Sequence, residues 1–155
     1  MFWTLPQELE HTGTRGVKVT EMSGVAMYPK LQLLCLRSNL VKRIAGVRDL
    51  TNLTSLELYD NRIRKIVDLA SLVQLKSLDL SFNKISAIEG LATLTNLESL
   101  YLANNRLSSI EGLATLERLG RIDLGANRIR KMENLSTLTS LTELWLGKNK
   151  ITQLA

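Results

Sequence analysis

Leucine and isoleucine recur along this chain in a pattern that repeats every 22 residues. The clearest copy covers residues 75–96 and follows the skeleton L-x-x-L-x-L-x-x-N-x-I-x-x-I-x-x-L-x-x-L. Six recognisable copies begin at Leu31, Leu53, Leu75, Leu97, Leu119 and Leu141. A fixed period of this length is typical of solenoids, in which each repeat is one coil that buries its apolar residues against the neighbouring coils.

The two halves of the repeat predict two different backbone structures. In L-x-x-L-x-L, the alternation predicts a short strand whose leucines face the core and whose intervening residues face outward. In the second half, an apolar residue at every third position suits a 3-10 turn or a short helix. We therefore expect an α/β solenoid with short parallel strands on the concave face and 3-10 or short helical segments on the convex face.

One polar position is the same in all six copies, and it is occupied by Asn39, Asn61, Asn83, Asn105, Asn127 and Asn149. An asparagine side chain offers both an acceptor and donors, so it can bond backbone groups where the strand turns into the loop. We interpret this asparagine ladder as structural.

The ends of the chain depart from the repeat. Residues 1–16 show no clear period, and we expect an irregular lead-in before a single repeat domain over residues 17–155. From Val19 an apolar residue at every third position predicts a degenerate first repeat, whose first half would place Thr12 and Thr14 where later copies have leucines. The sixth repeat stops at Ala155 before it is complete. Its leucines would then form an uncovered edge, so we expect a fragment of a longer protein or end-to-end self-association.

The residue types offer little chemistry for catalysis. The only histidine is His11 and the only cysteine is Cys35, so neither a metal site nor an internal disulfide is expected. The sequence has no glycine-rich phosphate loop and no G-x-S-x-G nucleophile elbow. Cys35 has no recurrent basic partner, and we interpret it as an inert thiol. We expect no enzyme activity, no cofactor and no metal.

The chain shows no membrane or secretory signal. Residues 1–10 contain no basic and apolar leader, and the longest apolar run, near residues 31–36, is too short to cross a bilayer. We expect an intracellular protein of the nucleus or cytoplasm with no membrane partner.

The concave face is predicted to bind protein. Between the last two leucines of each strand the residues are Cys35, Glu57, Asp79, Tyr101, Asp123 and Trp145, with Tyr59 and Glu143 close by and Arg37 and Arg121 mixed in. Glu57 and Asp79 would lie about 4.8 Å apart on adjacent strands, where like charges repel and a basic partner would relieve the cost. Exposed aromatic side chains are typical interface anchors. The predicted partner-binding residues are Asp79, Tyr101, Asp123, Trp145, Glu57, Tyr59 and Glu143.

The net charge of +5 suggests an acidic partner, such as a nucleic acid. A basic ridge follows the asparagines and comprises Arg62, Lys84, Arg106, Arg128 and Lys150, extended by Arg64, Lys65, Arg130 and Lys131. It is either a track for a phosphate backbone or a solvated ridge whose long stems cover the leucines. Glu89, Glu111 and Glu133 form a parallel acidic ladder, and no aromatics alternate with the cations. We favour the solvated ridge and expect no nucleic-acid partner.

The residues between the leucines resemble those of the protein phosphatase 1 regulatory subunit 7 family, which is built from 22-residue leucine-rich repeats. The resemblance is carried by CLRSNL at 35–40, LYDNRIRKI at 58–66, LDLSFNKI at 78–85, LGANRIRKMENL at 124–135 and ELWLGKNKIT at 143–152. It implies a non-catalytic subunit that holds the phosphatase catalytic subunit on its concave face. The matching contact positions are Asp79, Tyr101, Asp123 and Trp145. Members of that family usually have about twice as many repeats and a C-terminal cap.

Two other functions stay open. Similar 22-residue repeats occur in cytoskeletal, dynein-associated adaptors, which would co-sediment with microtubules or motor fragments. A ribonucleoprotein component would use the basic ridge, and its RNA binding would fall steeply with salt.

Overall fold

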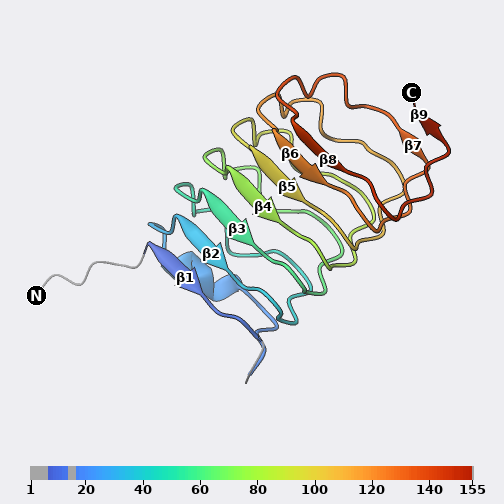
Figure 1. Cartoon of the computed structure of the whole chain (residues 1–155). Coiled ribbons are helices and arrows are strands. Elements are labelled where there is room, and N and C mark those ends of the chain that lie inside the picture. The colour runs from blue at the N-terminus through green and yellow to red at the C-terminus, as the bar shows by residue number, and fades with distance from the viewer. Residues whose placement is uncertain (1–6, 14–16, 155) are drawn as a thin grey trace, which may run out of the picture.

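The computed structural model describes residues 7–13 and 17–154. One sheet of seven parallel strands, in chain order, runs along the molecule (Figure 1). Its strands are β1 Glu8–Glu10, β2 Leu33–Cys35, β3 Ser55–Glu57, β4 Ser77–Asp79, β5 Ser99–Tyr101, β6 Arg121–Asp123 and β8 Glu143–Trp145. Two further strands, β7 Lys131–Met132 and β9 Gln153–Leu154, form a separate parallel pair near the C-terminal end.

The strand register follows the repeat. Leu56 of β3 lies opposite Leu78 of β4, which lies opposite Leu100 of β5. From β2 to β8 each strand is therefore displaced by one whole repeat, so equivalent residues of successive coils stand side by side. This arrangement confirms the predicted leucine-rich solenoid with parallel strands on one face.

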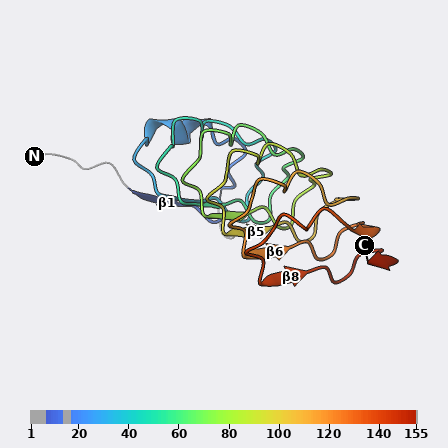
Figure 2. The same cartoon turned by 90° about the horizontal axis from the view of Figure 1, so that it is seen from above.

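The opposite, convex wall consists mainly of tight turns. In the coil that precedes β4, the Leu72 N–H donates to the Leu69 carbonyl at 2.9 Å, and the Leu75 N–H donates to the Leu72 carbonyl at 2.9 Å. Bonds that span three residues are those of a 3-10 helix, so the apolar spacing of three produces consecutive 3-10-type turns. The helix η1, Ser23–Met27, is the one continuous 3-10 segment among the described residues. Figure 2 shows the strands along one side and these turns along the other.

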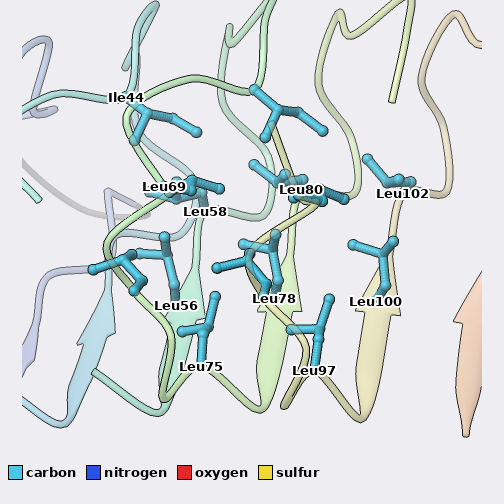
Figure 3. Packing of buried hydrophobic residues seen from close by; sticks show 14 of the residues in the cluster. Ile44, Leu56, Leu58, Leu69, Leu75, Leu78, Leu80, Leu97, Leu100 and Leu102 are labelled. Carbon is cyan, nitrogen blue, oxygen red and sulfur yellow. The ribbon is translucent and has the colours of Figure 1, made fainter. Parts of the chain in front are cut away.

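The leucines of successive coils pack between these two walls. Leu56, Leu78 and Leu100 are fully buried, and Figure 3 shows them stacked with the leucines of the adjoining turns. In the last described coil, Leu144 and Leu146 are only partly buried. The interior leucines touch a coil on each side, which is how a solenoid buries residues that one coil could not cover.

The N-terminal segment differs from the expected irregular lead-in. Residues 8–10 form β1, in which Leu9, and not Thr12, lies opposite Leu34. Thr12 is exposed, whereas Leu9 packs against the core. An apolar side chain gains more from covering Leu34 than a threonine would, so the first coil is longer than the later ones. Thr14, together with residues 1–6, 15, 16 and 155, lies outside the described residues.

The segment that follows this strand contains the apolar residues of the expected degenerate first repeat. The apolar residues that the sequence placed at every third position all contribute to the core, as buried or partly buried side chains: Val19, Met22, Val25, Tyr28 and Leu31. The helix η1 lies within this segment. No helix among the described residues is long enough or apolar enough to cross a bilayer.

Each asparagine of the ladder joins its coil to the one before it. The Asn83 Oδ1 accepts from the Ile63 N–H at 2.9 Å, and its Nδ2 donates to the Leu58 carbonyl at 2.9 Å and the Leu80 carbonyl at 3.1 Å. Asn61, Asn105 and Asn127 repeat this set of bonds. These bonds hold neighbouring coils at a fixed spacing, which positions the side chains of the concave face.

Candidate functional site

Two rows of side chains define the concave face. The central row comprises Glu10, Cys35, Glu57, Asp79, Tyr101, Asp123 and Trp145, which pair strand to strand. The second row lies two positions further along each coil and comprises Arg37, Tyr59, Ser81, Ala103, Gly125 and Gly147. Backbone hydrogen bonds continue between coils along this second row, so its residues also stand side by side.

In the N-terminal half of this face, Arg37 pairs with two acidic residues, Glu57 and Asp79. Its Nε lies 3.2 Å from the Glu57 Oε2, and its Nη2 lies 3.5 Å from the Asp79 Oδ2. The repulsion expected between Glu57 and Asp79 is therefore relieved inside the chain, without a partner. The sequence indicated that the face is mixed in charge, but not that Arg37 reaches both acids.

The aromatic residues of this half also contact each other. The Arg37 guanidinium lies 5.3 Å from the ring centroid of Tyr59. The Tyr59 ring lies 4.9 Å from the Phe82 ring at an interplanar angle of 51°. Tyr59 is therefore covered on two sides by residues of its own chain, and Phe82, which the sequence analysis did not single out, is the exposed aromatic here.

The C-terminal half of the concave face is hollowed. A shallow depression of about 430 Å³ has Tyr101 and Trp145 among its lining residues, with Asp123 between them in the central row. The second row supplies Ala103, Gly125 and Gly147 to this depression, and the loop residues Asn104, Ala126 and Lys148 complete its lining. The depression exists because these second-row residues carry almost no side chain, whereas Arg37 and Tyr59 fill the equivalent space in the N-terminal half.

Asp123 differs from Asp79 in its partners. The Oδ1 of each accepts a backbone N–H two residues later, from Gly125 at 2.8 Å and from Ser81 at 2.9 Å. The second oxygen of Asp79 faces Arg37. Asp123 forms no ion pair with any residue in the described ranges. The depression therefore contains a carboxylate with free hydrogen-bonding capacity.

Glu143, at the start of β8, is neutralised within the chain. Its Oε1 lies 3.0 Å from the Arg121 Nε, on the neighbouring strand β6. This hydrogen bond and the charge of Glu143 hold the pKa of the Arg121 guanidinium above its ordinary value. Glu143 consequently offers less free charge to a partner than Asp123 does.

Cys35 and His11 lie on adjacent coils, where the His11 N–H donates to the Cys35 carbonyl at 2.8 Å. Cys35 is a free, buried thiol that is 4% exposed. Burial raises the pKa of this thiol, and the Glu57 carboxylate adds to the increase. His11 is exposed, with its Nε2 3.2 Å from the Val17 carbonyl. Over residues 7–13 and 17–154, His, Cys, Asp and Glu side chains form no group that could hold a metal ion.

The basic ridge carries unpaired charge. Within the part of the chain that the structure describes, none of its nine cations forms an ion pair, and Glu89, Glu111 and Glu133 pair with no cation. The parallel acidic ladder therefore does not neutralise the ridge.

Of the seven predicted partner-binding residues, the structure gathers three around the depression: Tyr101, Asp123 and Trp145. Three others, Glu57, Tyr59 and Asp79, contact Arg37, and Glu143 contacts Arg121. Sequence reasoning missed the small second-row residues. The signal was available, because Ala103, Gly125 and Gly147 stand at the 22-residue spacing where earlier coils have Arg37, Tyr59 and Ser81.

Comparison with solved structures finds the same fold in bacterial proteins. The internalin InlF of Listeria monocytogenes aligns with a TM-score of 0.84 and 30% identity over 94% of this chain and 43% of that one. InlJ of the same organism aligns with a TM-score of 0.81 and 25% identity over 96% of this chain and 32% of that one. A leucine-rich repeat protein of Leptospira interrogans aligns with a TM-score of 0.81 and 25% identity over 86% of this chain and 35% of that one. The chain spans less than half the length of each of these three proteins.

A search of the curated proteins found no match. The model of the family described as "Leucine Rich repeats (2 copies)" matches residues 29–71, 73–115 and 95–136, which together make up more than half of the chain. These ranges include the strands β2 to β6, which carry most of the concave face. The chain belongs to the leucine-rich repeat family.

Proposed function

We propose that this chain is a non-catalytic scaffold that holds a protein partner on the C-terminal half of its concave face. The observation that carries the proposal is the alignment of Tyr101, Asp123 and Trp145 on neighbouring strands around the depression. Trp145 is 44% exposed although it is the largest apolar side chain of the row. Aromatic side chains on a rigid sheet lose little conformational freedom on binding, which makes them effective anchors.

We further propose that the partner is the catalytic subunit of protein phosphatase 1. This step is supported by the resemblance of the residues between the leucines to the regulatory subunit 7 family. Asp79, Tyr101, Asp123 and Trp145 occupy the positions that contact the phosphatase in that family. The partner would be met inside the cell, in the nucleus or cytoplasm.

Capture of purified phosphatase catalytic subunit by the immobilised chain tests the proposal. Tyr101→Ala and Trp145→Ala should each weaken binding by about 2 kcal/mol, because each removes an aromatic anchor from the depression. Phe82→Ala is the matched control, since Phe82 is also 44% exposed but does not line the depression. Far-ultraviolet circular dichroism of each variant verifies that the solenoid is folded.

Three results would count against the proposal. If the wild-type chain captures no phosphatase, this partner is wrong. If the Tyr101→Ala/Trp145→Ala double variant captures as much as the wild type, the phosphatase binds elsewhere on the solenoid. A loss that is equal for Phe82→Ala would show that the binding surface is not limited to the C-terminal half.

A second candidate function, in a ribonucleoprotein, is favoured by the unpaired cations of the basic ridge. It predicts RNA binding whose affinity falls steeply between about 50 and 200 mM salt, because bound cations displace counterions from the phosphates. Arg106→Glu combined with Arg128→Glu should abolish that binding and leave capture of the phosphatase intact. Co-sedimentation of the wild-type chain with microtubules would instead favour the cytoskeletal adaptor.

A further inference from the structure

We propose that the depression on the concave face is an arginine-binding subsite, in which Asp123 pairs with a guanidinium of the partner that stacks against Tyr101 and Trp145. The inference rests on the proposed function only in requiring a protein partner at this surface. It does not depend on which protein that is.

The chain itself contains the template for this interaction. Two repeats before Asp123, the Asp79 carboxylate receives a backbone N–H on its Oδ1 and the Arg37 guanidinium on its Oδ2. That guanidinium also lies over the aromatic ring of Tyr59. A guanidinium that pairs with a carboxylate and contacts an aromatic face is thus already accommodated by this strand geometry.

Asp123 has the same backbone environment as Asp79, but no arginine of the described residues pairs with it. The backbone bond is reproduced by Gly125, but the residue equivalent to Arg37 is Ser81, and the residue equivalent to Tyr59 is Ala103. The guanidinium and the ring are both missing, and Ala103, which stands in place of the ring, lines the depression together with Asp123. The unpaired Asp123 carboxylate therefore stands where a cation can reach it from outside the chain.

The aromatic neighbours favour arginine over lysine. Tyr101 and Trp145 lie on the two strands that flank Asp123. Their backbones are therefore two strand spacings apart, which is about 10 Å. A planar guanidinium can stack on an aromatic face while its N–H groups bond a carboxylate, whereas an ammonium group is compact and strongly hydrated. The site combines the two features that recognise arginine specifically.

The charges around the depression define the partner further. Arg121, beside Asp123 on β6, is neutralised by Glu143 and does not compete for the carboxylate. Lys148 is exposed at the rim and would repel an isolated cation. The bound segment should therefore place a backbone carbonyl or a carboxylate close to its arginine, so that Lys148 gains an acceptor.

The test uses the full chain and three small probes in solution: the N-acetyl methylamides of arginine, of lysine and of citrulline, the neutral isostere of arginine. Binding is followed through the NMR signals of the Gly125 N–H and the Trp145 indole N–H. The arginine probe should shift both signals in a saturable manner, and citrulline should bind at least about tenfold more weakly, because it cannot form the charge-assisted bond. The lysine probe should shift Trp145 less than arginine does.

Matched variants separate the subsite from general attraction to acidic residues. Asp123→Asn should weaken the arginine probe about tenfold, whereas Asp68→Asn should leave it unchanged, since Asp68 pairs with Arg48 and does not line the depression. Equal binding of arginine and citrulline, equal loss in the two variants, or no shift with arginine at millimolar concentration would overturn the subsite.

Failure of the subsite can be told apart from failure of the proposed function. If the phosphatase is captured through Tyr101 and Trp145 but the arginine probe does not bind, the function stands and the subsite is wrong. If the arginine probe binds at Asp123 but the phosphatase is not captured, the subsite stands for another protein partner. In a complex that does form, arginine-to-glutamine substitution in the partner should reproduce the loss caused by Asp123→Asn.

Discussion

Arg37 and Asp79, which stand two coils apart, are joined across the concave face, with the Arg37 Nη2 3.5 Å from the Asp79 Oδ2. The same guanidinium bonds Glu57 on the intervening coil. One side chain therefore pairs with two carboxylates of the N-terminal half of the central row. In the C-terminal half, no cation of the described residues pairs with Asp123.

Removal of Arg37 should destabilise the solenoid slightly. In Arg37→Gln the carboxylates of Glu57 and Asp79 face each other without a cation, and we expect a loss of about 0.5–1 kcal/mol in the free energy of unfolding, because the site is partly exposed. Urea unfolding at low salt measures the loss. At about 1 M salt, where the screening length is about 3 Å, the difference from wild type should shrink.

Arg48 provides the control for that experiment. Its side chain is 75% exposed and pairs with a single carboxylate, Asp68, at the convex side of the chain. Arg48→Gln should change stability less than Arg37→Gln at low salt. Equal losses would show that an arginine bridging two carboxylates stabilises the chain no more than one that pairs with a single carboxylate.

Replacement of an interior asparagine of the ladder should be more costly. Asn83→Ala leaves the buried N–H of Ile63 without its acceptor and removes the donor to the Leu58 and Leu80 carbonyls. We expect a loss of about 3 kcal/mol, because buried backbone groups would be left unsatisfied. Asn149→Ala should cost less, since Asn149 is only partly buried. Urea unfolding compares the two, and similar losses would contradict the coil-to-coil role assigned to the interior asparagines.

One substitution should stabilise the chain. The residue before each ladder asparagine has a positive φ, and at Ala126 this angle is 53°. A left-handed conformation is unfavourable for alanine and free of strain for glycine, so Ala126→Gly should raise the free energy of unfolding by up to about 1 kcal/mol. Ala103→Gly is the control, because Ala103 is not among the positive-φ residues and its substitution should destabilise. Thermal unfolding of the two variants should move in opposite directions.

The Cys35 thiol should react slowly and make stability depend on pH in the alkaline range. Burial raises its pKa, and the carboxylates of Glu57 and Glu10 add to the increase, against a backbone hydrogen bond at Arg37 that lowers it. Alkylation by iodoacetamide near pH 8 should therefore be much slower in the folded chain than in urea, because the thiolate is the reactive form.

The sign of the pH effect follows from the raised pKa. The unfolded state loses the thiol proton first as pH rises, so stability should fall between the ordinary thiol pKa and the raised value. Cys35→Ala should lack this part of the decline. A wild-type chain whose stability falls no more steeply than that of Cys35→Ala in this pH range would contradict the pKa shift.

The repeat could be predicted from the sequence because its apolar spacing acts locally. Leu75, Leu78 and Leu80 alternate as a strand requires, and the spacing of three in the second half matches the turns that the structure shows. The prediction went wrong at the N-terminus, where Leu9 and not Thr12 covers Leu34. An insertion in one coil breaks the fixed spacing, and only the packing of that coil on its neighbour shows where the strand lies.

The sequence by itself determined the solenoid, the strand register from β2 to β8 and the residues of the central row, because each follows from a periodic pattern within one coil. Only the tertiary structure decided which of those residues are free to bind. Arg37 reaches Glu57 and Asp79 on two other coils, whereas Asp123 has a hollow beside it. A long side chain can reach a neighbouring strand only because stacked coils place their strands about 4.8 Å apart. The pattern within one repeat does not show this contact.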